Sequence, residues 1–234
     1  MVALEALIRW NHPCRGRLPP DVFIPLAEET GSIHQIGDWV IETACAQLAD
    51  WQTATPSEPL LQVSVNVSPV QLAADGFVDR VAGLLERSAI APGSLCLEIT
   101  EAVLLAGEVP AAVLGALRAL GIRILLDDFG TGYSSLAYLT RFPIDTLKID
   151  QAFVAQLDGT SQHSAITKAI LAIANELELG VVAEGVETLP QIEQLRMLKC
   201  PFVQGYAISR PLPAGDVPAY LRPHRRERLL AGTG

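Results

Sequence analysis

Short apolar runs of strand length recur along the chain, and amphipathic stretches of helix length separate most of them. The runs cover residues 2–10, 61–67, 95–101, 121–127, 146–150, 180–187 and 202–206. Stretches with apolar residues at three-to-four spacing cover residues 20–30, 36–51, 77–87, 111–120, 165–177 and 189–198. Alternating strands and helices within one domain favour parallel strands, and this length favours a (β/α)-barrel over an open sheet.

The run at residues 61–67 alternates cleanly between apolar and polar side chains. One face carries Val63, Val65 and Val67, and the other carries Gln62, Ser64 and Asn66. Because neighbouring side chains on a strand point to opposite faces, one face of this strand is polar throughout. A polar face on so apolar a strand predicts a barrel interior lined with polar groups.

Polar or charged side chains stand at the end of each predicted strand. They are Glu5, Asn66, Glu98, Asp127, Lys148, Glu184 and Gln204. In barrels of parallel strands the active site lies at the carboxyl ends of the strands. Each residue alone also has a structural explanation: Asn66 could cap a turn, Glu98 or Glu184 could pair with an arginine, and Lys148 could bridge to Asp150. The recurrence at every strand end favours a site.

Two adjacent carboxylates, Asp127 and Asp128, end the fourth run just before a turn that contains Gly130 and Gly132. They can converge on one point only where the strand is ending, with one projecting from the strand and the other from the loop. Paired carboxylates there suit a hard divalent cation, whose charge offsets their repulsion. A solvated Asp-Asp turn before a helix is the alternative. The oxygen-rich set at the other strand ends favours Mg²⁺ or Mn²⁺ over zinc.

Composition narrows the classes of partner. The chain has 234 residues, 50% of them hydrophobic, which is enough for one barrel-sized domain with a large core. Its net charge of -9 argues against a broad phosphate-binding surface, so long duplex nucleic acid is not expected as a partner. Charge or glycine interrupts every long apolar stretch, and no signal peptide or transmembrane helix is predicted.

The cysteines indicate the redox environment. Cys14, Cys45, Cys96 and Cys200 are scattered, and no C-x-x-C pair occurs. We expect them to be reduced core thiols of a cytoplasmic protein.

An ordered series of motifs resembles the EAL-type phosphodiesterases that open cyclic di-GMP. The series begins with the naming triplet at residues 5–7 and continues as EALIRWNHP, NVSPVQL, LEITE, DDFGTGYSSL, LKID, VVAEGVE and QGYAISRP. The similarity runs from residue 2 to about residue 213. It implies hydrolysis of cyclic di-GMP to linear 5′-pGpG and a TIM-like barrel. The expected divisions are a phosphodiesterase domain at residues 1–221 and a basic tail at 222–234.

The resemblance also implies roles for individual residues. Glu5, Asn66, Glu98 and Asp127 resemble metal ligands, and Asp128 and Glu184 resemble ligands or near-ligands of a second ion. The expected catalytic residues are Lys148, which touches the attacking water, together with Glu184, Asp128, Gln204 and Glu101. Glu101 resembles the glutamate that holds the Asp-Asp loop. The expected substrate contacts are Leu7, Arg9, Asp150, Gln204 and Pro211.

Partners and alternatives follow from the same resemblance. We expect a homodimer that uses residues 133–142, and an upstream sensor or diguanylate cyclase domain. A silent module that binds cyclic di-GMP, or a structural output domain, remains the alternative, although such family members usually lack residues that this chain keeps. Family members also carry a helix and an antiparallel first strand before the EAL strand. This chain shows seven strands, so we expect it to melt poorly without about 25 upstream residues, the length of one helix and one strand.

Overall fold

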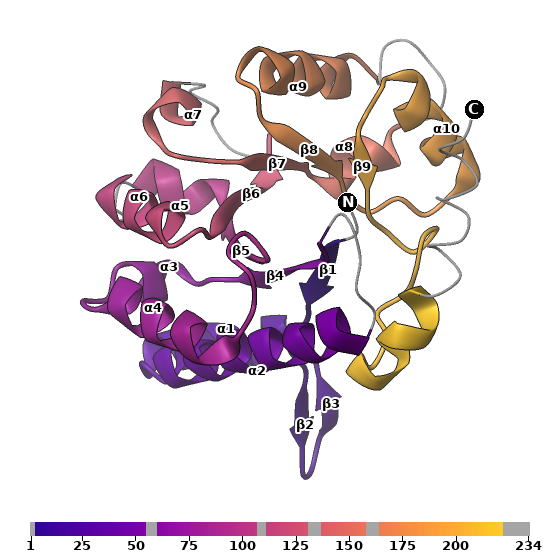
Figure 1. Cartoon of the computed structure of the whole chain (residues 1–234). Helices are drawn as coiled ribbons and strands as arrows, with labels where there is room; N and C mark the ends of the chain where they lie inside the picture. The colour runs from indigo at the N-terminus through magenta and orange to yellow at the C-terminus, as the bar shows by residue number, and fades with distance from the viewer. Residues whose placement is uncertain (1–2, 55–59, 107–110, 131–136, 158–163, 222–234) are drawn as a thin grey trace.

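Seven parallel strands form one curled sheet in the computed structural model, which describes residues 3–54, 60–106, 111–130, 137–157 and 164–221 (Figure 1). The strands in spatial order are β1 (Ala3–Ala6), β4 (Gln62–Asn66), β5 (Leu95–Thr100), β6 (Arg123–Phe129), β7 (Thr146–Ile149), β8 (Gly180–Ala183) and β9 (Phe202–Val203). Spatial order therefore equals chain order, as in a barrel built from repeated strand and helix units. In the described part of the chain, β1 and β9 form the two ends of this order.

Helices cover the outside of the sheet (Figure 1). The longer ones are α1 (Pro20–Glu29), α2 (Ile33–Ala54), α4 (Phe77–Ser88), α6 (Ala111–Ala119), α9 (Ser164–Glu176) and α10 (Leu189–Met197). Shorter pieces follow several strands: α3 (Pro69–Leu72), α5 (Glu101–Ala106), α7 (Ala137–Arg141), α8 (Gln151–Ala155) and the 3₁₀ turn Ala214–Asp216. None of the helices in the described ranges is both long and apolar enough to span a bilayer.

Local chemistry explains where several helices begin. Pro20 takes the first position of α1, where its missing N–H leaves no hydrogen bond unmade. Thr188 caps α10, and Gln191 completes a capping box with it. Asp150 caps α8 by accepting a hydrogen bond from the Ala152 N–H at 2.8 Å. The caps at Asp150 and Thr188 fix the starts of the helices that follow β7 and β8.

The hydrophobic core lies between the sheet and the helices. Apolar side chains of the central strands, including Val65, Leu97, Leu126 and Leu147, are almost fully buried there. The opposite face of the same strands carries Ser64, Glu98 and Lys148, which are also buried. The alternation predicted from the sequence is therefore present, and the polar face is enclosed within the curled sheet.

The first strand is shorter than its apolar run. We expected a strand over residues 2–10, but β1 ends at Ala6 and the chain then forms a hairpin, β2 (Trp10–His12) with β3 (Gly16–Leu18). The Trp10 ring meets His12 and Phe23 edge to face. These contacts and the turn that follows His12 favour a hairpin over a continuation of β1. Figure 1 shows the hairpin projecting from the sheet. The hairpin was not expected from the sequence.

The cysteines divide into two classes, so the expectation of four core thiols is wrong for Cys14. All four are free, with Cys45 and Cys96 buried, Cys200 half-buried and Cys14 exposed in the β2–β3 hairpin. Burial raises the pKa of Cys45 to about 11 and that of Cys96 to about 12. Burial also raises the pKa of Cys200.

We expect iodoacetamide at pH 8 to modify Cys14 rapidly and to leave Cys45 and Cys96 intact. At that pH only about one in a thousand thiols with a pKa of about 11 is ionised, and burial further excludes the reagent. Peptide mass spectrometry over a time course would measure the rates, and labelling in urea is the control in which every thiol reacts. Equal rates for Cys14 and Cys96 in the folded protein would contradict the burial described here.

Candidate functional site

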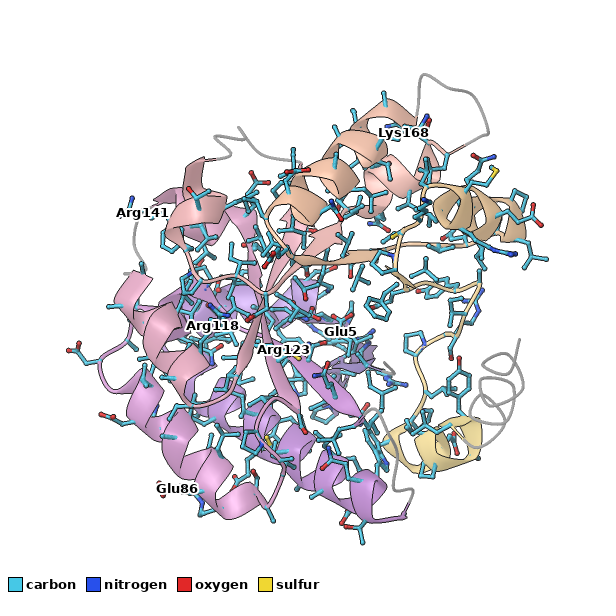
Figure 2. All side chains as sticks on the ribbon, turned by 45° about the horizontal axis from the view of Figure 1, so that its top comes forward. Glu5, Glu86, Arg118, Arg123, Arg141 and Lys168 are labelled. Carbon is cyan, nitrogen blue, oxygen red and sulfur yellow. The ribbon has the colours of Figure 1, made fainter. Side chains whose placement is uncertain are left out.

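The sheet brings the polar strand ends together at one mouth. In the strand register, Asn66 lies beside Glu98, and Thr100 lies beside Asp127. The stagger of neighbouring strands thus carries these side chains around one end of the curled sheet. Figure 2 shows Glu5 toward the middle of the ring of strands, whereas Glu86 and Lys168 lie on helices outside it.

Lys148 stands at the centre of the cluster. Its Nζ lies 2.6 Å from Glu98 Oε2, 2.7 Å from Glu184 Oε1, 3.3 Å from Asp127 Oδ1 and 4.0 Å from Glu5 Oε2. The lysine is 1% exposed and Glu98 is 2% exposed, so water screens this charge cluster weakly. One ammonium faces four carboxyl groups, so it could balance the charge of only one of them.

Burial and charge pull the pKa values of the cluster in opposite directions. Burial raises the pKa of Glu98 to about 7, although Lys148 opposes the rise. Burial likewise raises the pKa of Glu184 to about 8 against the same lysine. For Lys148, burial alone would lower the pKa, but the carboxylates of Glu98, Glu5 and Glu184 outweigh it and hold the pKa above its usual range. In the protein alone, one lysine is not enough to keep every carboxyl of the cluster ionised at neutral pH.

Glu5 links the two ends of the sheet. Its Oε1 accepts a hydrogen bond from Asn66 Nδ2 at 2.9 Å, and its Oε2 accepts one from Gln204 Nε2 at 2.5 Å. Glu5 lies in β1, Asn66 ends the neighbouring β4 and Gln204 follows β9. This single carboxylate therefore joins the first strand of the order to the segment that follows the last one. These two amides supply the hydrogen-bond partners that a partly buried carboxylate requires.

The Asp127-Asp128 pair departs from its predicted geometry. β6 continues through both residues to Phe129, with a register irregularity between Leu126 and Phe129 in its pairing with β7. Asp128 takes φ +54°, a left-handed conformation that Asp tolerates better than most residues. The two side chains were expected to converge where the strand ends. Instead, a register irregularity within β6 changes their directions. Asp128 is exposed, and its backbone N–H donates to Asp127 Oδ1 at 3.0 Å.

Two contacts hold the turn after Asp128. Glu101, the first residue of α5 and 2% exposed, accepts a hydrogen bond from the Gly130 N–H at 3.0 Å. Gly130 has φ +98°, and a Cβ there would lie 2.8 Å from the Phe153 ring. A glycine is therefore needed both for the backbone conformation and for the close approach of α8. Residues 131–136 lie outside the described ranges, and they include part of the stretch expected to form a dimer contact.

Asp150 lies close to the second aspartate. Although Asp128 is exposed, partial desolvation of its carboxyl raises its pKa, and the neighbouring Asp127 and Asp150 carboxyls add to the rise. The bridge between Lys148 and Asp150 that the sequence left open is not the arrangement found, because Lys148 turns to Glu98 and Glu184 instead.

The remaining expected substrate contacts are more dispersed. Leu7 is 42% exposed beyond the end of β1, and Pro211 is exposed in the segment after β9. Arg9 was expected to contact phosphate, but its Nη1 donates to the carbonyl oxygen of Ile8 at 2.7 Å. One of the five N–H donors of the guanidinium is thus used by the backbone of its neighbour.

The donor set suits a hard divalent cation. Among the described residues, no three His, Cys, Asp or Glu side chains are already grouped around a shared metal position. The Lys148 ammonium instead lies between the carboxylates and supplies the positive charge there. Carboxylate and amide oxygens with excess negative charge are the ligands of Mg²⁺ and Mn²⁺.

Sequence reasoning missed a group of residues behind Asn66. The Ser68 hydroxyl donates to Glu28 Oε1, and Gln71 Oε1 accepts from the Ser68 N–H at 3.2 Å. Gln71 is 3% exposed and lies against Gly37 of α2. The Ser-Pro-Val-Gln stretch matches the capping-box pattern and could have indicated α3. No local signal indicates the contacts with Glu28 and Gly37, which belong to other helices.

Comparison with known proteins places this arrangement among characterised families. The EAL domain family model matches residues 1–211. The chain is 44% identical over 215 residues to the bifunctional diguanylate cyclase/cyclic di-GMP phosphodiesterase MucR of Pseudomonas aeruginosa, covering 92% of this chain and 31% of MucR. It is 45% identical over 223 residues to the cyclic di-GMP phosphodiesterase NbdA of the same organism, covering 95% of this chain and 28% of NbdA. The chain thus spans about three tenths of these curated relatives.

Solved structures give the same picture. A structure described as PaMucR phosphodiesterase in complex with c-di-GMP superposes with a TM-score of 0.83 at 44% identity, covering 91% of this chain and 86% of that one. The EAL domain of Mycobacterium smegmatis DcpA superposes with a TM-score of 0.74 at 38% identity, covering 81% of this chain and 85% of that one. The curled seven-stranded sheet therefore corresponds to most of the barrel in these proteins.

Proposed function

This chain belongs to the EAL domain family, and we propose that it hydrolyses cyclic di-GMP to linear 5′-pGpG with the help of divalent cations. The observation that carries the proposal is the cluster in which Lys148 Nζ lies 2.6 Å from Glu98 and 2.7 Å from Glu184. A buried lysine among carboxylates at the carboxyl ends of barrel strands combines cation ligands with a group that stabilises negative charge. The naming of MucR and NbdA as cyclic di-GMP phosphodiesterases supports the choice of substrate.

The proposed ligand assignment follows the positions in the mouth. Glu5, Asn66, Glu98 and Asp127 would hold one Mg²⁺ or Mn²⁺ ion, and Asp128 and Glu184 would hold a second. The chemistry that such ions supply is activation of water near neutral pH and stabilisation of the departing oxygen. Two ions are favoured because one lysine leaves most of the carboxylate charge unbalanced.

The chain's own residues account for the remaining steps. Water attacks one phosphorus in line, the bond from that phosphorus to the 3′-oxygen breaks, and the product carries a 5′-phosphate and a free 3′-hydroxyl. Lys148 holds the attacking oxygen and offsets negative charge in the transition state. Asp128 or Glu184 accepts the proton of the attacking water. Gln204 orients Glu5 through their hydrogen bond, and Glu101 holds the turn after Asp128 through Gly130.

The wider assembly forms part of the proposal. We assign residues 1–221 to the phosphodiesterase domain and residues 222–234 to a basic tail. Residues 133–142 would form a contact between two copies of the chain. MucR carries a diguanylate cyclase activity in its name, which supports a sensor or cyclase domain upstream of this domain in the native protein.

The decisive experiment is incubation with cyclic di-GMP and Mg²⁺ or Mn²⁺, followed by chromatographic separation of the nucleotides. We expect conversion to pGpG, and no conversion in EDTA or in an Asp127→Asn variant. Calorimetric binding of cyclic di-GMP with no conversion under any metal condition would overturn hydrolysis and favour the silent binding module.

Replacing Glu101 tests the role of the turn. We expect Glu101→Ala to lower kcat about 10–100-fold, because the Gly130 N–H loses a charged acceptor and a supporting contact of this kind typically carries an effect of that size. Glu101→Gln keeps an acceptor oxygen and should retain more activity. Steady-state kinetics of both variants provides the measurement, with exposed Glu86→Ala on α4 as the matched control. Unchanged kcat in Glu101→Ala would remove the turn from the mechanism.

A further inference from the structure

The segment that carries Asn66 turns away from the sheet at once. β4 ends at Asn66, the Val67 N–H donates to the Glu98 carbonyl at 3.0 Å, and α3 begins at Pro69. The direction of the Asn66 side chain therefore depends on how Val67 and Ser68 are held. Asn66 is exposed, so apart from its hydrogen bond to Glu5 Oε1 its own side chain has little packing to hold it.

A capping box organises this turn. Ser68 Oγ accepts a hydrogen bond from the Val70 N–H at 3.2 Å, and Gln71 Oε1 accepts one from the Ser68 N–H at 3.2 Å. α3 has only four residues, and helices of that length are unstable without tertiary contacts. The turn therefore needs support from elsewhere in the molecule.

Two outer helices give that support. The Ser68 hydroxyl donates to Glu28 Oε1 of α1, a charge-assisted hydrogen bond. The Gln71 carboxamide lies directly against the backbone of α2 at Gly37. A Cβ added at position 37 would overlap the Gln71 carboxamide, so any larger residue must displace the glutamine.

We propose that Glu28, Gly37, Ser68 and Gln71, the β4 brace, are positioning residues that set the orientation of Asn66 for cation binding. The inference rests on the proposed function, because it assigns Asn66 to a divalent cation. Glu28 of α1 contacts Ser68, and Gly37 of α2 contacts Gln71, so both helices hold the turn after β4. That turn follows Asn66, whose Nδ2 lies 2.9 Å from Glu5 Oε1 at the mouth. The outer helices thereby control cation affinity without touching the ion.

The test is Mn²⁺ binding measured by calorimetry in the absence of nucleotide. We expect Gln71→Ala and Gly37→Ala each to weaken Mn²⁺ binding about tenfold, the usual lower effect of losing an outer-shell support. The double variant should match Gln71→Ala alone, because the methyl group added at position 37 fits once the glutamine is shortened. Gly115→Ala is the matched control, since that helical glycine has no heavy atom within 4 Å of an added Cβ.

A second comparison separates positioning from general stability. In an Asn66→Ala background, Gln71→Ala should cause no further loss of Mn²⁺ affinity, because the brace acts through Asn66. An equal tenfold loss in that background, or unchanged affinity in folded Gln71→Ala, would overturn the proposal. Where Gly37→Ala does not fold, Glu28→Gln and Ser68→Ala serve instead, with non-additive losses expected.

The controls also keep the two proposals apart. A parent protein that binds Mn²⁺ and leaves cyclic di-GMP intact would refute hydrolysis, and the brace would still be judged on the Mn²⁺ affinities. A parent protein that binds no Mn²⁺ would overturn the brace as a determinant of cation affinity.

Discussion

Lys148→Ala is expected to lower kcat for cyclic di-GMP by about 10²-fold or more, with little change in nucleotide affinity. A charge that stabilises the transition state contributes to rate, and removing such a group typically costs about 10²–10³-fold. The geometry supports this assignment because the ammonium is 1% exposed and within 2.7 Å of both Glu98 and Glu184. Steady-state kinetics and calorimetric binding of the nucleotide would separate the two effects.

The buried position of Lys148 adds a second consequence. Removing one partner of a buried ion pair leaves an uncompensated charge, which commonly costs about 3–5 kcal/mol of stability. Lys148→Met retains side-chain volume and should be compared with Lys148→Ala at a saturating Mg²⁺ concentration, where bound cations replace the lost charge. Lys168→Ala, on the outer helix α9, is the matched control (Figure 2). Equal losses of kcat/KM and nucleotide affinity would assign Lys148 to uniform substrate binding.

The fold was predictable because its signals are local and repeated. Runs of strand length alternate with amphipathic stretches, and the family match and the solved relatives confirm the barrel and the family resemblance drawn from the motifs. The strand ends also placed Glu5, Glu98 and Lys148 together, since parallel strands carry their carboxyl ends to one side. Hydrophobic periodicity, together with the polar residues within the strand runs, therefore indicated the mouth.

The misplaced details depend on contacts between distant segments. Periodicity could not show that β6 continues past Asp127 with Asp128 at φ +54°, because that backbone conformation is fixed by neighbouring elements. The exposure of Cys14 follows from a hairpin whose aromatic contacts involve Phe23 on a later helix. The approach of Gln71 to Gly37 likewise joins segments that have no shared pattern.

The metal-free protein is expected to lose stability as the pH rises from about 5 to 8.5. Burial raises the pKa of Glu98 to about 7 and of Glu184 to about 8 in the folded state. Between the unfolded pKa values, about 4.3, and these folded values, the folded state binds more protons than the unfolded state. Stability is therefore fully present at low pH and is lost as the pH passes through the folded pKa values.

The size of this effect follows from the linkage relation. From pH 5 to the folded pKa values the two carboxyls span about two and about three pH units, and each unit is worth about 1.4 kcal/mol. The change is therefore about 7 kcal/mol, which corresponds to a fall in Tm of about 15–25 °C for a domain of this size. Differential scanning calorimetry in EDTA at pH 5, 7 and 8.5 would measure it. Millimolar Mg²⁺ should flatten the dependence, because a bound cation favours the ionised carboxylates that high pH produces.

Matched variants separate the effect of the titrating site carboxyls on Tm from the effect of the net charge of the whole chain. Rising pH also increases the net negative charge, whose self-repulsion acts in the same direction. Glu184→Gln removes one titrating group of the site and should reduce the slope of Tm against pH. Exposed Glu86→Gln on α4 should leave the slope unchanged. A metal-free Tm that stays constant or rises between pH 5 and 8.5 would show that the folded protein does not hold the pKa values of Glu98 and Glu184 above their unfolded values, and the prediction would be wrong.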